Sequence, residues 1–159
     1  MVTNEKESKP LKKGPTMQIG KHGMELVFPE KEFYEITPPV YLASSHTNCW
    51  KCSQNTRVFC LAHKDSDSGI ITFVSSLADI PEELSAILKE KAPTYYMDYT
   101  RWSENHYYVN HCECGAKLGD FFLHNEPDGP FFIMSEAELD QVAMSDLNLK
   151  EAIKIKSGY

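Results

Sequence analysis

The sequence predicts an α+β domain in which antiparallel hairpins dominate and two or three helices lie at the periphery. Short apolar runs rich in β-branched and aromatic residues recur between turn-forming clusters, a pattern typical of strands joined by hairpins. Helical periodicity is confined to a few short stretches that follow residues favoured at helix starts. A chain of 159 residues with 42% apolar and 25% charged residues has the size and composition of one globular domain.

The chain begins with a lysine-rich segment, residues 1–22, which is interrupted by proline and glycine and has no sustained periodicity. Residues 1–21 hold five lysines and two glutamates, a net charge of +3, and little apolar surface to offset the entropy of ordering them. We therefore expect a flexible basic leader over residues 1–22 and a single acidic domain over residues 23–159. Removal of the leader should leave folding intact.

The first part of this domain is predicted to be extended. Residues 24–28 and 33–36 are short apolar runs separated by a proline, and residues 40–43 form a strand-like run after two further prolines. Residues 57–62 and 70–74 have strand composition and are separated by a turn rich in Asp, Ser and Gly. This second pair is expected to form a hairpin.

Three helices are predicted. Residues 81–91 follow an acidic cap candidate, Asp79, and carry Leu84, Ile87 and Leu88 at helical spacing. A capping-box pattern at Ser135 to Glu138 predicts a helix that continues to about residue 144. A shorter helix is expected near residues 147–155.

A second hairpin is predicted between the first two of these helices. Residues 94–101 and 106–110 are rich in tyrosine and other strand-forming residues, and the four residues between them favour a turn. The hairpin leads into a cysteine-containing turn. Residues 121–123 are then interpreted as the end of a strand that runs into an acidic Pro/Gly loop, with the apolar residues 131–133 beyond it.

Four of the five cysteines are arranged in two pairs, Cys49 with Cys52 and Cys112 with Cys114. Without a secretory segment, paired cysteines indicate metal or redox chemistry rather than disulfides. Two thiols in one tight turn can bind the same ion, and zinc takes four such ligands in a tetrahedron. The fourth ligand is either Cys112 or His111, which also has the two-residue gap to Cys114; thiolate is the commoner structural ligand, so Cys112 is favoured.

Residues 49–62 and 107–122, each a cysteine turn carried by a hairpin, resemble the zinc-ribbon family. The resemblance implies that a structural Zn²⁺ ion holds the two hairpins together, although 59 residues separate Cys52 from Cys112. A site closed by four cysteines leaves no coordination position for water and so contributes stability rather than catalysis. A redox dithiol at Cys49 and Cys52 is disfavoured, because a strand rather than a helix follows the pair.

The other side chains of types that can bind metal are expected to have structural roles or to be solvated. Cys60 and His63 form a C-x-x-H pair, but Cys60 lies within an apolar strand and is expected to be part of the core. His46 precedes Cys49 by three residues and is expected to be a solvated histidine. The tyrosines of the second hairpin are expected to pack across the strands or to present one face to a protein, because only one arginine lies among them.

The charge distribution bears on the kind of partner. The whole chain has a net charge of -7, and from residue 22 onward 11 bases and 21 acids leave -10. Such a surface repels nucleic acid and attracts basic proteins. No apolar stretch approaches the roughly 18 residues of a membrane span, so we expect a cytoplasmic protein with no membrane partner.

The sequence thus favours a non-catalytic zinc-binding protein-interaction module for a basic partner. Its narrower form is an inhibitor or immunity-like protein that blocks a basic toxin or nuclease, with acidic steering and tyrosine anchors.

Two alternatives stay open. One is a metal-dependent nuclease or hydrolase that uses Asp120, His124, Glu126 and Asp128, although these residues also suit an ordinary acidic loop. The other is a zinc-ribbon nucleic-acid adaptor that uses the basic leader.

Overall fold

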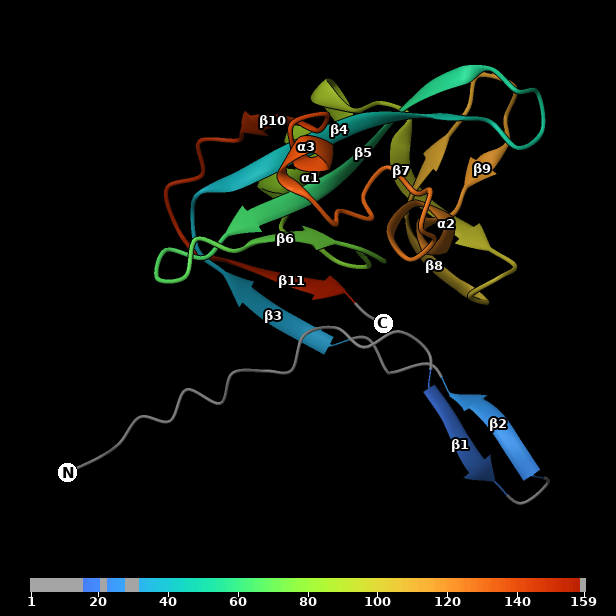
Figure 1. The fold of residues 1–159 in the computed structure, drawn as a ribbon. Coiled ribbons are helices and arrows are strands. Elements are labelled where there is room, and N and C mark those ends of the chain that lie inside the picture. Colours follow the sequence, from blue (N-terminus) through green and yellow to red (C-terminus); the bar gives the residue numbers. More distant parts are fainter. Residues whose placement is uncertain (1–15, 21–22, 28–31, 158–159) are drawn as a thin grey trace.

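The computed structural model describes residues 16–20, 23–27 and 32–157 (Figure 1). Within them the fold is α+β with antiparallel sheets, as predicted, and it contains three helices. The strands are β1 (Thr16–Gly20), β2 (Gly23–Val27), β3 (Glu32–Ile36), β4 (Val40–Asn48), β5 (Asn55–Lys64), β6 (Ile71–Val74), β7 (Tyr95–Thr100), β8 (Asn105–His111), β9 (Lys117–Leu118), β10 (Ala143–Asp146) and β11 (Ile153–Ser157). The helices are α1 (Glu82–Lys91), α2 (Asp120–His124) and α3 (Glu136–Leu139).

The expected leader is described only in part. Residues 1–15 and 21–22 lie outside the described residues, whereas β1 pairs with β2 in an antiparallel hairpin. The extended structure expected for residues 24–28 and 33–36 is found as β2 and β3.

Two sheets position the cysteine turns. The larger sheet has the order β10-β4-β5-β6, and its centre is the long β4–β5 hairpin. A second sheet has the order β7-β8-β9, and a pair of strands, β3 and β11, completes the domain. The predicted hairpins at residues 57–74 and 94–110 are therefore confirmed as β5–β6 and β7–β8.

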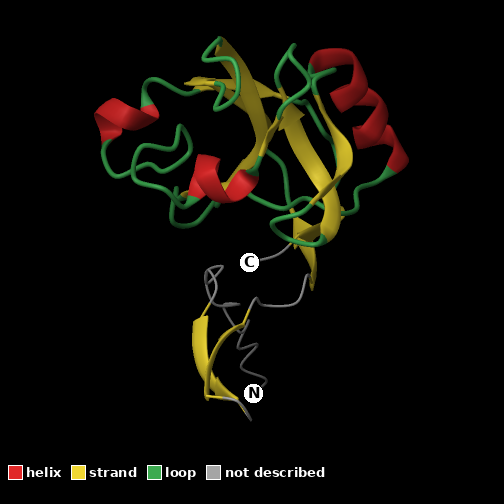
Figure 2. Ribbon diagram, turned by 90° about the vertical axis from the view of Figure 1, so that its right-hand side faces the viewer, coloured by secondary structure: helices red, strands yellow, loops and turns green. Residues whose placement is uncertain are grey.

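Strand β5 is buried on both faces, which explains its uninterrupted apolar run. Phe59 and Leu61 face one core, which includes Leu84 and Leu88 of α1. The alternate residues of β5 face a second core, which is shared with the cysteine turns, α2 and the segment after it. Figure 2 shows the longest helix on one side of the strands and the two short helices on the other. A central strand covered on both faces favours continuous rather than alternating hydrophobicity.

Helix α1 confirms the predicted helix. It begins after Pro81, which occupies the N-cap position, and carries glutamates in its first turn and lysines in its last turn. This distribution of charge is favourable to the helix dipole. Leu84 and Leu88 are buried at 1% and 0% exposure, as their helical spacing predicted. No helix among the described residues is long and apolar enough to span a membrane.

The C-terminal predictions were wrong in part. The predicted cap is present: Ser135 Oγ accepts a hydrogen bond from the Glu138 N–H at 3.2 Å. The Glu138 side chain does not reach back to the Ser135 N–H as in a regular capping box, since its Oε2 accepts a bond from the preceding Met134 N–H at 2.6 Å. The helix nevertheless ends at Leu139, and the segment expected to continue it forms β10. Residues 147–155 form no helix; β11 pairs with β3 instead. At residues 143–146, pairing with β4 outweighed local helix propensity, whereas residues 153–157 alternate isoleucine with lysine, which favours a strand.

The segment before the acidic loop also differs from prediction. Residues 121–123 lie in helix α2 rather than at the end of a strand. Leu123 is buried while Phe122 is 55% exposed, so α2 presents one apolar side chain to the core and one to the surface. A single helical turn is too short for periodicity to reveal it.

Candidate metal centre

The first cysteine turn joins β4 to β5. The Cys49 N–H donates to the Gln54 carbonyl and the Ser53 N–H donates to the Cys49 carbonyl, each at 2.9 Å. Ser53 has a φ of 63°, which allows the chain to reverse. The Lys51 N–H points at the Cys49 sulfur at 3.4 Å. Backbone N–H groups directed at a thiolate are typical of metal-binding cysteine turns.

The second cysteine turn joins β8 to β9 and repeats this arrangement in a shorter form. The Cys112 N–H donates to the Ala116 carbonyl and the Gly115 N–H donates to the Cys112 carbonyl, each at 2.9 Å. Gly115 has a φ of 89°, in the region that glycine adopts without strain. Both bonds span one residue fewer than in the first turn, which accounts for the C-x-C spacing of Cys112 and Cys114.

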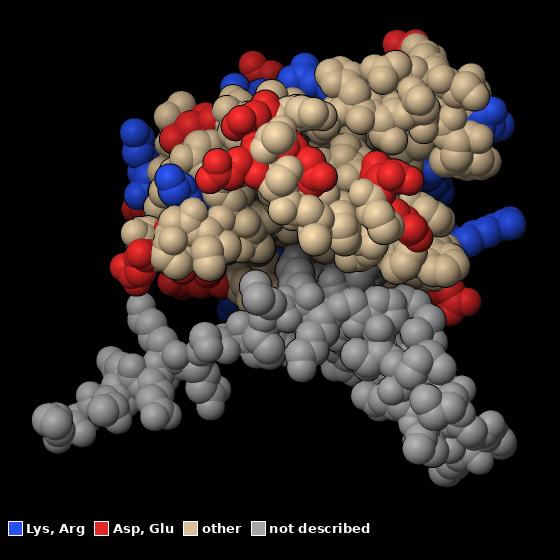
Figure 3. Space-filling model, in the orientation of Figure 1, with Lys and Arg blue, Asp and Glu red and all other residues tan. Residues whose placement is uncertain are grey.

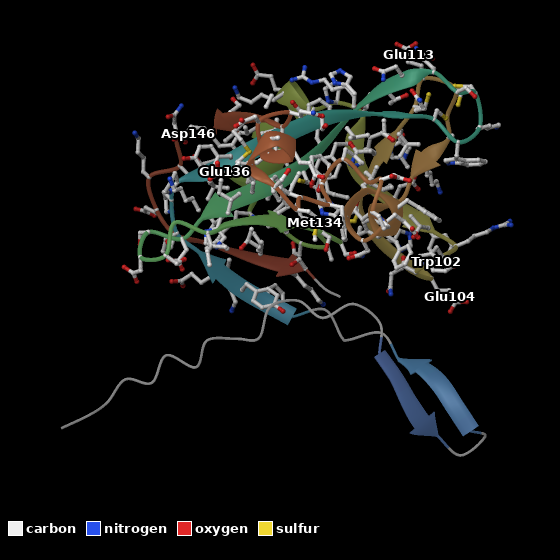
Figure 4. The ribbon with its side chains drawn as sticks, viewed as in Figure 1. Trp102, Glu104, Glu113, Met134, Glu136 and Asp146 are labelled. Carbon is white, nitrogen blue, oxygen red and sulfur yellow. The ribbon has the colours of Figure 1, made fainter. Side chains whose placement is uncertain are left out.

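The two turns bring the sulfurs of Cys49, Cys52, Cys112 and Cys114 within 4.8 Å of one another. The Cys49 and Cys114 sulfurs are 3.7 Å apart, and the Cys52 and Cys112 sulfurs 3.5 Å apart. Figure 4 shows yellow sulfur atoms gathered beside Glu113. A tetrahedron with Zn–S bonds of about 2.3 Å places its sulfurs about 3.8 Å apart. The cluster therefore has the size and donor set for a tetrahedral thiolate-bound metal ion.

Side chains outside the cysteine pairs hold the two turns together. The indole N–H of Trp50 donates to the Lys117 carbonyl at 2.8 Å, and the Gln54 side chain donates to Glu113 at 3.3 Å. One bond runs from the first turn to the start of β9, and the other runs from the first turn to the second, so these contacts connect the two turns without a metal ion.

The surroundings of Cys49, Cys52 and Cys112 shift their pKa values in different directions. Bonds from the Thr56 hydroxyl and the Cys114 backbone lower the pKa of Cys112 to about 6. The Cys52 backbone N–H lowers the pKa of Cys49. A backbone bond from Gln54 acts in the same direction on Cys52, but burial and the neighbouring thiols raise the pKa of Cys52 to about 12. In each turn, therefore, hydrogen bonds favour ionisation of one cysteine, and the thiolate is the form that binds metal.

His111, the alternative fourth ligand, lies outside the cysteine cluster. Its Nε2 is 2.8 Å from Asp98 Oδ2 and its Nδ1 is 3.0 Å from the Thr94 carbonyl oxygen. The Tyr96 ring stacks on the imidazole at a centroid distance of 3.8 Å. The hydrogen bond to His111 lowers the pKa of Asp98. His111 thus tethers the end of β8 to β7.

The other candidate ligands lie apart from the cluster. Cys60 is fully buried in the second core, as expected. His46 is exposed, although it lies in strand β4. Burial lowers the pKa of His63, which is consistent with a neutral imidazole at physiological pH.

The acidic residues considered for catalysis are not gathered into a metal-binding group. Among the described residues, the four cysteines are the one set of three or more His, Cys, Asp or Glu side chains close enough to share an ion. Asp120 is 1% exposed, and its Oδ2 accepts a hydrogen bond from the Ser76 N–H at 2.7 Å. The His124 ring lies 5.1 Å from the Phe131 ring. These contacts give both side chains a structural role.

Sequence reasoning missed Asn110, which joins the two sheets next to the cysteine turns. Its Oδ1 accepts a hydrogen bond from the Phe59 N–H at 2.8 Å, and its Nδ2 donates to the Phe59 carbonyl at 2.9 Å. The side chain is fully buried. It pairs with Phe59 as a neighbouring strand would, and so fixes β8 against β5. No local pattern distinguishes this asparagine from others in the chain.

Substitution of Thr56 by valine is expected to weaken zinc binding about tenfold, since groups that hydrogen-bond to metal ligands typically contribute that much. The Thr56 hydroxyl lies 3.4 Å from the Cys112 sulfur and 3.0 Å from the Gln54 carbonyl oxygen. Valine has the same shape and suits a strand, but it cannot donate to sulfur. Competition with a chromophoric chelator measures the affinity, and Thr56→Ser is the matched control. Equal affinities for Thr56→Val and the unmodified protein would contradict this role.

No protein-family model matches the chain, and it has no match among curated proteins or solved structures. Its functional interpretation therefore depends on its own residues and geometry.

Proposed function

We propose that this chain is a non-catalytic zinc-binding protein-interaction module whose acidic body docks on a basic protein. The single observation that carries the zinc assignment is the cluster of Cys49, Cys52, Cys112 and Cys114 within 4.8 Å. Four thiolates complete the tetrahedral shell of Zn²⁺ and leave no position for a water nucleophile. The ion would join the β4–β5 and β8–β9 turns and so stabilise the contact between two sheets.

The interaction half of the proposal is supported by charge. The chain from residue 22 onward has a net charge of -10. Figure 3 shows acidic side chains around the middle of one face, where α3 and its end carry the exposed residues Glu136, Glu138 and Asp140. A surface of this sign accelerates encounters with basic proteins and repels nucleic acid. The narrower form of the proposal is an inhibitor or immunity-like protein for a basic toxin or nuclease.

Selection from a phage-displayed random peptide library tests the interaction half. The zinc-loaded protein is the target, and the selected peptides are expected to carry net positive charge. Their association rate should fall as sodium chloride rises from about 50 to 500 mM, because the Debye length shortens over that range. Selection of neutral or acidic peptides, or association rates insensitive to salt, would contradict the proposal. Turnover of RNA or DNA with Mg²⁺ or Mn²⁺ would favour the enzyme alternative.

A further inference from the structure

A cavity of about 760 Å³ lies next to the cysteine turns and has no part in the proposed metal site. Its walls come from the end of β4, the first cysteine turn, β9, α2 and the loop after α2. We call it the aromatic cavity and define it by six lining residues: Trp50, Leu118, Phe122, Leu123, Glu126 and Asp128. It combines an apolar floor with two carboxylates, and its described lining includes no lysine or arginine.

The aromatic side chains of this cavity are exposed and held in place. Trp50 is 72% exposed and Phe122 55% exposed. The indole N–H of Trp50 is fixed by its bond to the Lys117 carbonyl. The Phe122 ring packs edge-on against Phe121 at a centroid distance of 5.7 Å, and Trp102 lies 6.3 Å away. Rings that are already ordered lose little conformational entropy when a ligand covers them.

The loop that carries the carboxylates is also fixed. The Gly129 N–H donates to the Glu126 carbonyl at 2.8 Å, and the Phe131 N–H donates to the Leu123 carbonyl at 2.9 Å. A Cβ atom at Gly129 would lie 2.5 Å from the carbonyl oxygens of Phe122 and Leu123, so only glycine allows the loop to approach α2 this closely. The backbone that carries Glu126 and Asp128 is thereby held at the cavity.

We propose that the aromatic cavity binds an arginine-containing segment of the partner. The inference rests on the proposed function and deepens it by assigning the site and the side chain recognised. The methylene stem of an arginine covers the floor formed by Leu118 and Leu123, while its guanidinium group pairs with the Glu126 and Asp128 carboxylates. Trp50 and Phe122 add cation–π attraction, which favours a planar guanidinium over an ammonium group.

Nuclear magnetic resonance titration of the ¹⁵N-labelled full chain tests this assignment. The probes are three blocked pentapeptides, Gly-Gly-Xaa-Gly-Gly, in which Xaa is arginine, citrulline or norleucine. Citrulline keeps the shape of arginine without its charge, and norleucine keeps only an apolar stem. The arginine peptide should bind most tightly and shift the resonances of Trp50, Phe122 and Glu126. Equal binding of citrulline or norleucine would overturn the proposal in favour of an apolar occupant.

Substitutions test which carboxylates of the chain pair with the arginine side chain. The double variant Glu126→Gln, Asp128→Asn should weaken binding of the arginine peptide about tenfold, as expected for loss of two partly exposed ion pairs. Glu90→Gln removes an exposed carboxylate of α1, which lies on the other side of the strands, and should change the affinity by less than about twofold. Equal affinities for the double variant and the unmodified protein would overturn the assignment.

The outcomes separate this inference from the proposed function. If the arginine peptide shifts resonances of α3 rather than those of the cavity residues, the proposed docking on basic partners stands. The aromatic cavity is then overturned as the binding site. Failure of every basic peptide, including those selected from the library, overturns both.

Discussion

Serine in place of Cys49 or Cys114 is expected to abolish stoichiometric zinc binding and to lower the free energy of unfolding by about 3 kcal/mol or more. A ligand that binds only the folded state stabilises it by about 2.7 kcal/mol at a free concentration 100 times its dissociation constant. Structural zinc ions typically bind far more tightly than such a concentration requires. Elemental analysis and urea unfolding under reducing conditions measure the two effects.

Cys60 provides the matched control. It is fully buried in the second core and lies outside the metal-binding set. Cys60→Ala should keep one zinc ion per chain and lose about 1 kcal/mol through reduced packing. Cysteine variants of the cluster that keep both zinc and the unfolding free energy of the unmodified protein would show that the four thiols do not bind the ion.

Alanine in place of Asn110 is expected to lower the free energy of unfolding by about 2–5 kcal/mol. The substitution leaves the buried N–H and carbonyl of Phe59 without the side chain that pairs with both. Each unsatisfied buried polar group costs about 1–3 kcal/mol. The loss should appear as a lower urea midpoint with an unchanged slope.

Asn55→Ala is the control for this prediction. Asn55 lies at the exposed start of β5, and surface substitutions of this kind usually change stability by less than about 0.5 kcal/mol. If Asn110→Ala lowers the free energy of unfolding as little as Asn55→Ala does, β5 and β8 are held together without the Asn110 bridge.

The cysteine turns could be predicted because their information is local. The spacing of Cys49 and Cys52, the position of Gly115 and the strand-like residues on both sides predict two hairpin turns carrying thiols. The structure brings these turns together across 59 intervening residues, as the zinc-ribbon resemblance implied. The exclusion of His111 from the cluster required the positions of Asp98 and Thr94, which neither spacing nor composition reveals.

Most of the missed features depend on long-range contacts. Residues 143–146 have no strand pattern of their own, and they become β10 because β4 offers an edge to pair with. Residues 153–157 do alternate isoleucine with lysine, which favours a strand, but the run is short, and its pairing partner β3 lies far away in the sequence. Nothing in the sequence distinguishes Asn110 from the other asparagines, because its role follows from its position beside Phe59 in the fold. The aromatic cavity similarly requires Trp50 and Phe122 to meet from segments about 70 residues apart.

X-ray absorption at the zinc edge, on protein purified under reducing conditions and reconstituted with one equivalent of Zn²⁺, tests the central claim most directly. The thiol cluster predicts one tightly bound ion with four sulfur neighbours at about 2.3 Å. Failure to retain zinc, or a first shell in which nitrogen or oxygen replaces sulfur, would contradict the assignment of Cys49, Cys52, Cys112 and Cys114 as the ligands.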